Sequence, residues 1–219
     1  MSATTRTSST TARLSMLAGI AFVVLFVVGF VISADTPDPD ERLAWRRWYF
    51  DSGHRTSAVV GMYLMLVGVL AFVWFLAGLR QRLAEGGASD TLVSLVFGAG
   101  LVFAILAIGG VTARSVVPAG KVFVDQSLPG GDIAQQLEGL GFGTLLIPGA
   151  LAAGAFVAAA SAASRQVGAL PAWLTIAGFV VAVLQLVGVL FFPFGLFVLW
   201  VLVVAIVLLA RSRTPQTSA

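Results

Sequence analysis

Long apolar runs separated by short polar segments make up most of this chain. Each of the first four runs has the roughly 20 residues that an α-helix needs to cross a bilayer. The pattern therefore predicts four transmembrane helices, over about residues 14–33, 58–79, 92–113 and 140–163.

A fifth run is almost uninterruptedly apolar over residues 171–210. One helix of this length would measure about 60 Å, whereas the hydrocarbon core is only about 30 Å thick. The chain must fold back, and the only break is FFPFG at residues 191–195, where proline and glycine are typical of turns. This predicts spans over residues 171–191 and 194–210, and hence an all-α bundle of six transmembrane helices over residues 14–211.

The segments outside the apolar runs are polar. Residues 1–13 are rich in Ser and Thr, so we expect a disordered tail, and residues 212–219 form a second tail. Two larger loops are expected on the outer side, at residues 34–57 and 114–139. A signal peptide is the alternative for the first apolar run, but its apolar region is typically about 7–15 residues, so an uncleaved first helix is favoured.

The basic residues orient the bundle in the membrane. With the N-terminus inside, seven Arg and Lys residues fall on the inner side and six on the outer side. The inner arginines lie directly at helix ends, where the positive-inside rule has most force. We therefore expect both termini to be cytoplasmic.

Composition supports a membrane protein and narrows its chemistry. Hydrophobic residues make up 58% of the chain and charged residues 11%, against roughly 25% charged residues in soluble domains. With no cysteine and a single histidine, His54, the chain has no means of forming a disulfide, a thiolate site or a multi-histidine metal or haem site by itself. No metal and no cofactor are therefore expected. The basic residues are dispersed at the ends of apolar runs, so we expect no nucleic-acid partner despite the net charge of +3.

Ionisable residues are missing from the middle of every predicted span. Proton-coupled carriers and pumps usually keep such groups at membrane depth. The pattern argues against that mechanism, but it leaves open a passive pore or transport of an apolar molecule.

The densest polar feature is DPDERLAWRRWYFDSGHR, in the first outer loop. We expect a short helix here, with Trp45, Trp48 and Tyr49 on one side at positions i, i+3 and i+4. One interpretation is an interfacial helix whose rings lie at headgroup level. The other is a docking surface for a lipid headgroup or a partner protein, with Arg46 and Arg47 contacting phosphate or carboxylate.

Three polar residues, Asp51, His54 and Arg55, stand together at the start of the second span. Asp51 and His54 are spaced i, i+3, so they can touch on a helix. A catalytic interpretation would use His54 as a general base oriented by Asp51. No serine nucleophile or oxyanion site accompanies them, so helix capping with an ion pair at the membrane face is the favoured interpretation.

The fourth span is rich in small residues, which allow helices to approach closely. Gly139 and Gly143 form a GxxxG pattern, and Ala150 and Gly154 continue it. Pro148 interrupts the same helix and predicts a kink, which packs tightly on its neighbours or lines a cavity.

Gln185 is the most polar residue well inside a predicted span. An amide at this depth is expected to form an interhelical hydrogen bond, with contact to a ligand as the alternative.

Three pieces of the chain carry a resemblance: DSGHRTSAVVGMYLMLVGVLAFVWFLAGLRQRL, GFGTLLIPGALAAG and LPAWL. They resemble a family of uncharacterised bacterial integral membrane proteins of similar size, over about residues 14–210. The resemblance implies a six-helix fold in a bacterial plasma membrane, and it implies no catalytic residues.

The functional hypothesis follows from the predicted ion-free spans and the aromatic, charged first loop. We expect a non-enzymatic membrane protein that acts as a structural or accessory component, or binds lipid, a membrane-protein partner or a second copy of itself. The alternative is a small transporter or channel for a neutral or hydrophobic solute.

Overall fold

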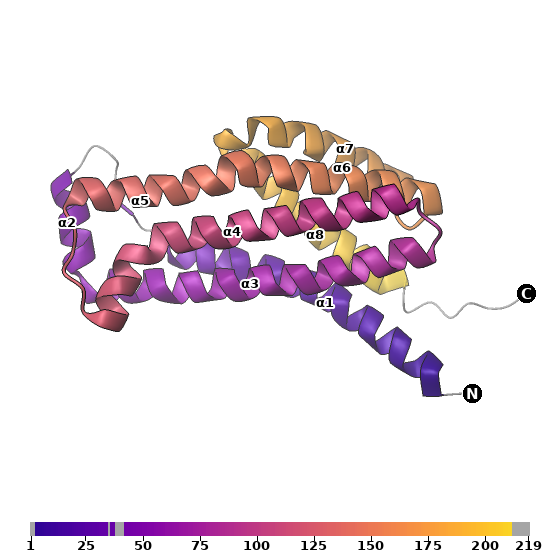
Figure 1. Ribbon diagram of the computed structural model, residues 1–219, viewed down its shortest axis with the longest axis horizontal. Helices are drawn as coiled ribbons and strands as arrows, with labels where there is room; N and C mark the ends of the chain where they lie inside the picture. The colour runs from indigo at the N-terminus through magenta and orange to yellow at the C-terminus, as the bar shows by residue number, and fades with distance from the viewer. Residues whose placement is uncertain (1–2, 35, 38–41, 212–219) are drawn as a thin grey trace, which may run out of the picture.

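The computed structural model describes residues 3–34, 36–37 and 42–211, and within them the chain is a bundle of helices without strands (Figure 1). Five helical segments are long and apolar enough to cross a membrane, and a shorter apolar helix covers Ala172–Gly188. The predicted all-α fold class is therefore confirmed. In chain order the elements are α1 (Ala3–Ile32), α2 (Arg42–Phe50), α3 (Ser52–Glu85), α4 (Asp90–Val124), α5 (Gly131–Thr144), the π-helical turn η1 (Leu145–Gly149), α6 (Ala150–Val167), α7 (Ala172–Leu184), the 3₁₀ segment η2 (Gln185–Leu190) and α8 (Phe192–Arg211).

The helices pack in a closed order around one core. Helix α1 lies along α3, α3 along α4, and α4 along α5 and α6. Helix α6 contacts α7, and α8 returns against α1. Five helices each contribute a fully buried phenylalanine to the centre, and the ring centroids of neighbouring pairs are 4.7–6.4 Å apart. The five rings belong to Phe22, Phe72, Phe103, Phe156 and Phe197. Aromatic side chains therefore fill the middle of the bundle.

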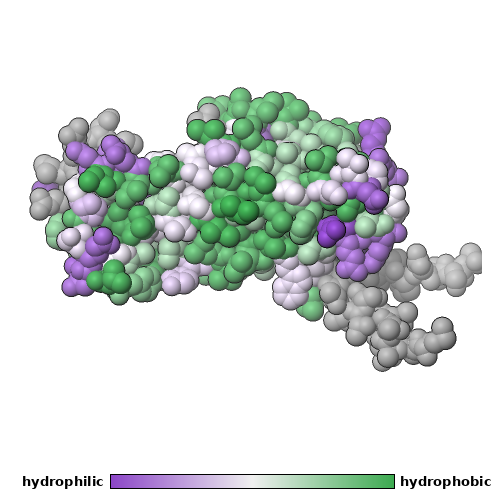
Figure 2. Space-filling view, viewed as in Figure 1, coloured by the Kyte–Doolittle hydropathy of each residue, from purple (hydrophilic) through white to green (hydrophobic). Residues whose placement is uncertain are grey.

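Apolar side chains also cover the outside of the bundle. Figure 2 shows hydrophobic surface over the middle of the molecule and hydrophilic surface gathered towards its two ends. Leu70, Ile105 and Val183 are each more than 60% exposed, at 62%, 66% and 65%. A bilayer is the solvent that accepts such a surface.

The two ends of the bundle differ in construction. At the end that holds both termini, Arg82 donates to the carbonyl of Leu208 and Arg211 donates to the carbonyl of Gly168, so α3, α6 and α8 finish at one level. Helix α8 has 20 residues and α3 has 34, so α3 extends about 20 Å further at its other end. We call this other end, where α2 lies across the ends of α3, α4 and α5, the α2 end (Figure 1).

The predicted loop over residues 114–139 is wrong. Helix α4 continues through Pro118 to Val124, and α5 already begins at Gly131. Pro118 removes one backbone donor, but the neighbouring hydrogen bonds continue the helix. The chain reverses only over residues 125–130, and Asp125 ends α4 in the left-handed conformation, with φ 49°.

Two further boundaries differ from the prediction. Helix α1 begins at Ala3, so the segment expected to be a disordered tail is helical from residue 3. Ser, Thr and Ala there introduce no break, and each added residue gains a helical hydrogen bond. Helix α3 begins at Ser52 rather than at residue 58, because Asp51 caps it.

The turn between α7 and α8 lies earlier than FFPFG predicts. The 3₁₀ segment η2 and Phe191, which has φ 64° and ψ −42°, reverse the chain. Such a backbone conformation is strained for a residue other than glycine. Pro193 falls in the first turn of α8, where its missing N–H has no helical partner to lose.

Candidate functional site

A buried ion pair joins α4 to α5 near the α2 end. The Arg114 Nη2 atom lies 2.9 Å from Glu138 Oε1, and Arg114 Nε donates to the same oxygen at 3.1 Å. Arg114 is 6% exposed and Glu138 is 8% exposed. Both residues lie in helical segments long and apolar enough to span a membrane. The two residues stand just outside the predicted spans 92–113 and 140–163, so the absence of ionisable residues from the middle of those spans is unaffected, but the sequence pattern did not predict a buried ion pair.

The guanidinium of Arg114 is held on several sides. Its Nη2 also donates to the backbone carbonyl of Ser33, at the end of α1, at 3.2 Å. Its central carbon lies 4.4 Å from the centroid of the Phe142 ring and 5.5 Å from that of Phe30. A buried charge needs such compensation, because desolvation costs several kcal/mol per ion. Arg114 therefore connects α1, α4 and α5.

A close approach of two glycines brings the pair together. A Cβ atom on Gly141 would lie 2.5 Å from the carbonyl oxygen of Gly110, and one on Gly110 would lie 2.8 Å from that of Gly141. Only glycine allows the backbones of α4 and α5 to come this close. Arg114 is one turn after Gly110, and Glu138 is one turn before Gly141. In an antiparallel pair, these two side chains therefore meet.

A cavity of about 650 Å³ lies beside the ion pair at the α2 end, and we call it the polar cavity because half of its lining residues are Thr, Gln or Glu. Among the described residues of its wall, Glu138 is the charged one. The lining combines hydroxyl, amide, carboxylate and aromatic groups, from Thr36, Pro37, Trp45, Gln135, Gln136, Glu138, Gly139 and Phe142. Cavities of this size are typical of small-molecule sites.

An aromatic cluster covers the cavity from the side of α2. Trp45 and Tyr49 are each 3% exposed and pack against Val117 of α4 and Ala134 of α5. Burial raises the pKa of the Tyr49 phenol, the nearby Glu138 carboxylate raises it further, and Arg114 offsets part of the effect. The phenol therefore stays protonated at physiological pH. The predicted short helix is confirmed, but its rings face the protein rather than lipid headgroups.

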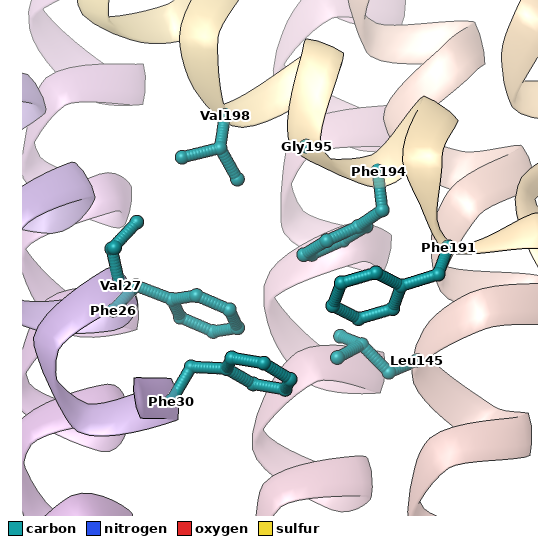
Figure 3. A pocket seen from close by; sticks show the side chains of 8 residues that line it. All are labelled: Phe26, Val27, Phe30, Leu145, Phe191, Phe194, Gly195 and Val198. Atoms are coloured by element: carbon teal, nitrogen blue, oxygen red, sulfur yellow. The ribbon is translucent and has the colours of Figure 1, made fainter. Parts of the chain in front are cut away.

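An apolar crevice of about 210 Å³ lies between α1, η1 and α8 (Figure 3). Phe26 and Phe194 are nearly fully buried in it, at 2% and 3% exposed. Val27 and Phe191 are each 43% exposed, so the crevice opens on the surface that lipid would cover. Its other lining residues are Phe30, Leu145, Gly195 and Val198.

Two phenylalanines connect the crevice to the polar cavity. Phe30 lines the crevice, Phe142 lines the cavity, and their ring centroids are 6.2 Å apart with the planes at 82°. Both rings also contact Arg114. The linings of the apolar crevice and the polar cavity thus adjoin at the contact between these two rings, with the ion pair beside it.

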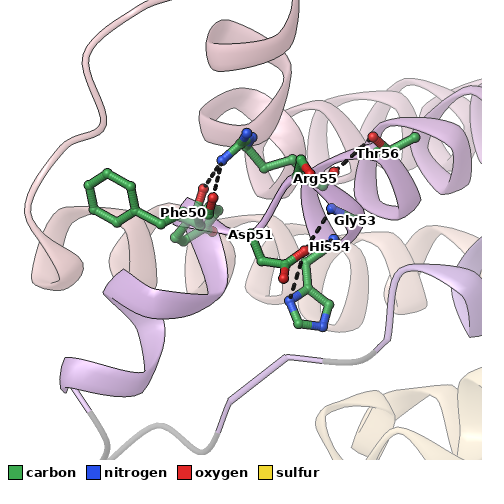
Figure 4. Close-up of polar contacts among 8 residues, drawn as sticks. Phe50, Asp51, Gly53, His54, Arg55 and Thr56 are labelled. Carbon is green, nitrogen blue, oxygen red and sulfur yellow. Dashed lines mark hydrogen bonds and ion pairs between the residues drawn. The ribbon is translucent and has the colours of Figure 1, made fainter.

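Asp51 and Arg55 cap the helices that meet at the α2–α3 junction (Figure 4). Asp51 Oδ1 accepts hydrogen bonds from the backbone N–H groups of Gly53 and His54, at 2.6 and 3.2 Å, and these bonds lower the pKa of its carboxyl. Arg55 donates to the carbonyls of Tyr49 and Phe50 at 2.6 and 2.8 Å, which satisfies the end of α2. The capping interpretation is confirmed.

His54 belongs to the same junction. Its Nδ1 lies 4.0 Å from Asp51 Oδ1, and its ring stacks on that of Trp48 at 5.4 Å with the planes 6° apart. Of the remaining candidates in this loop, Arg47 is exposed and does not line the cavity. The side chain of Arg46 lies outside the described part of the structure. Among the described residues of the predicted docking surface, Trp45 lines the cavity.

The small residues of the fourth span divide into two groups. A Cβ atom on Gly139 or Gly143 would meet no atom within 4 Å, so the predicted GxxxG contact is wrong and Gly141 makes the close approach instead. Ala150 is fully buried, and a Cβ on Gly154 would lie 2.9 Å from Gln185 Cβ, so these two positions do pack.

Pro148 and Gln185 both lie where the backbone departs from a regular α-helix, in η1 and η2. Pro148 lies in the π-helical turn η1, where the widened backbone accommodates its ring, and it is exposed on the outside of the bundle. Gln185 Nε2 donates to the carbonyl of Pro193 at 2.5 Å and thereby links η2 to α8. Neither residue lines any of the three cavities described, including a third of about 220 Å³ between α4 and α5.

The comparisons with known proteins return nothing: no family model matches this chain, and neither a curated protein nor a solved structure is detectably similar to it. The resemblance to a bacterial six-helix family therefore stays a prediction.

Sequence reasoning missed the ion pair because it placed both charges in a loop. A signal was present, since opposite charges stand one turn beyond Gly110 and one turn before Gly141 on helices that form a hairpin. Phe30 and Phe142 carried no comparable signal, because nothing distinguishes them from the other phenylalanines among the 16 in the chain.

Proposed function

We propose that this protein binds a membrane lipid at its α2 end, with the acyl chain in the apolar crevice and the headgroup in the polar cavity. The observation that carries the proposal is the ring contact between Phe30, which lines the crevice, and Phe142, which lines the cavity, because it places the two spaces next to each other. The acyl chain of an amphiphile needs an apolar space at the depth of the hydrocarbon core. Its headgroup needs a polar space next to this one, towards the membrane surface.

The depth of the two spaces supports this assignment. Arg114 is 24 residues beyond Asp90, the first residue of α4, and a helix of that length rises about 36 Å. Because the hydrocarbon core is about 30 Å thick, the ion pair and the cavity lie near the level where headgroups begin. The crevice lies on the core side of that level, between helices that lipid surrounds.

In this proposal the protein is a binding component rather than an enzyme. Asp51, the residue that would orient His54 in a catalytic role, accepts two backbone N–H groups as a helix cap. The features that favour the transporter alternative are the kink expected at Pro148 and the amide of Gln185, and neither residue lines one of the three described cavities.

We further propose a bacterial plasma membrane with both termini cytoplasmic. Arg80, Arg82, Arg165 and Arg211 all lie near the end that holds the termini, which supports this orientation under the positive-inside rule. A membrane-protein partner or a second copy of the chain stays a prediction.

The Gly195→Leu variant tests lipid binding. Gly195 lines the crevice, and a Cβ there would meet no atom within 4 Å, so a larger side chain has space to begin there and should take up part of the crevice. Native mass spectrometry of the purified protein with a defined phospholipid should show binding at least about tenfold weaker than wild type. Gly98→Leu is the matched control, because Gly98 is equally unobstructed and lies outside the crevice. Equal lipid binding by both variants would contradict the proposal.

A further inference from the structure

The carboxylate of Glu138 presents its two oxygens differently. Arg114 uses only Oε1, through Nε at 3.1 Å and Nη2 at 2.9 Å. The hydrogen bond and ion pair from the described residues go to Oε1, and Glu138 lines the polar cavity, so Oε2 is the oxygen left to accept from a ligand. A carboxylate oxygen in such a position accepts hydrogen bonds and donates none.

The guanidinium of Arg114 is engaged by groups of the protein and does not line the cavity. Its Nη2 donates to the carbonyl of Ser33, and its guanidinium lies against the Phe142 ring at 4.4 Å. Arg114 is not among the lining residues, and none of the described residues on the cavity wall is Lys or Arg. Among the described residues of the wall, a bare phosphate would therefore meet the Glu138 carboxylate without a cationic partner.

We infer that this cavity selects lipid headgroups that donate N–H or O–H hydrogen bonds, such as a primary ammonium or the hydroxyls of glycerol. The inference rests on the proposed function, and it adds the chemical class of the headgroup. Glu138 Oε2 accepts the hydrogen bond, while Thr36 and Gln136 supply further polar groups on the wall. A quaternary ammonium has no N–H to donate. A phosphate monoester brings a negative charge that the Glu138 carboxylate repels.

Two glycines of α5 provide a matched pair of variants. Gly139 lines the cavity, and Gly143, one turn later, does not. A Cβ on either would meet no atom within 4 Å, so both positions have space for a larger side chain to begin. Gly139→Leu should reduce the headgroup cavity without replacing Arg114 or Glu138, whereas Gly143→Leu adds the same side chain outside the cavity.

The experiment measures lipid affinity by native mass spectrometry, with four phospholipids that carry identical acyl chains. Wild type is expected to bind phosphatidylethanolamine or phosphatidylglycerol about tenfold more tightly than phosphatidylcholine and phosphatidic acid, the effect of one hydrogen bond to a charged group. A preference for the ethanolamine lipid alone identifies an ammonium ligand, and a preference for the glycerol lipid alone identifies hydroxyls.

The variants separate headgroup selection from chain binding. Glu138→Gln places amide N–H donors at this position, so the preference should fall to within about twofold or reverse towards phosphatidic acid. Gly139→Leu should lose the preference for donor headgroups, and Gly143→Leu should keep it. These two variants still test headgroup selection if Glu138→Gln fails to fold.

Two outcomes would overturn the inference. If all four lipids bind wild type equally and Gly195→Leu still weakens them all, headgroup selection is wrong and the proposed lipid binding stands. If no lipid binds wild type more tightly than Gly195→Leu, both proposals are wrong.

Discussion

At the scale of single residues, the ion pair of Arg114 and Glu138 has an energetic role that depends on both partners. Each charge is almost fully buried, and the attraction between them offsets a desolvation penalty of several kcal/mol per ion. The carbonyl of Ser33 and the Phe142 ring add to the compensation for Arg114 alone. Replacing one member of the pair should therefore cost much more free energy of folding than replacing both with apolar residues.

Replacing one member of the pair should be worse than replacing both. Arg114→Met or Glu138→Met leaves an uncompensated buried charge and should lower the free energy of unfolding by about 3–5 kcal/mol. The double variant should recover most of that loss. Denaturant titration in mixed micelles, followed by tryptophan fluorescence, measures all three, and a double variant as unstable as the sum of the singles would contradict this role.

At the scale of helices, the site depends on how closely α4 approaches α5. Gly110 and Gly141 let the backbones touch, and this contact sets the register in which Arg114 meets Glu138. The same helix carries Gly139 and Gly143, which have open space around them. Glycines close together in sequence therefore differ in function according to the face on which they lie.

Alanine substitutions distinguish the two faces. Gly141→Ala places a Cβ 2.5 Å from the Gly110 carbonyl oxygen, so α4 and α5 must separate, at a cost of about 1–3 kcal/mol. Gly143→Ala should be neutral or stabilising by up to about 1 kcal/mol, because alanine favours the helix. The same denaturant titration compares them, and equal losses in both variants would show that the contact between Gly110 and Gly141 does not set the helix separation.

At the scale of the whole molecule, the helices α3 and α4 are longer than the hydrocarbon core of a bilayer is thick, and their added length lies at the α2 end. Helix α8 matches the roughly 30 Å of hydrocarbon, and α3 is about 20 Å longer. The added length carries α2, the aromatic cluster and the polar cavity. The orientation of the bundle thus decides which side of the membrane can supply a headgroup.

Labelling of single cysteines tests the orientation, since the chain has no cysteine of its own. Ser127 is exposed between α4 and α5 at the α2 end, and Ser89 is exposed between α3 and α4 at the opposite end. A membrane-impermeant maleimide should label Ser127→Cys in intact cells, and Ser89→Cys only after permeabilisation. The opposite pattern would place the cavity on the cytoplasmic side.

Much of the fold follows from the sequence because bilayer thickness sets a length that apolar runs must match. The runs over residues 58–79 and 92–113 were long enough to identify their helices, and α8 followed from arithmetic on the last apolar run. The capping role of Asp51 and the short helix α2 were also predictable, because caps and aromatic spacing are local signals. The helix boundaries within residues 114–139 were not predictable from the sequence. Pro118 is usually a helix breaker, but it is tolerated within α4, a helix that tertiary contacts support.

The sequence by itself determined that this chain is a bundle of membrane-spanning helices with an aromatic, charged segment at one end. Only the tertiary structure decided that Arg114 and Glu138 are buried together, that Gly141 rather than Gly139 makes the close contact, and that Phe30 and Phe142 bring the linings of two cavities into contact. The physical reason is that hydropathy and helix capping act along the chain, over one or two turns. Burial of a charge depends instead on the partner that a different helix brings within about 3 Å.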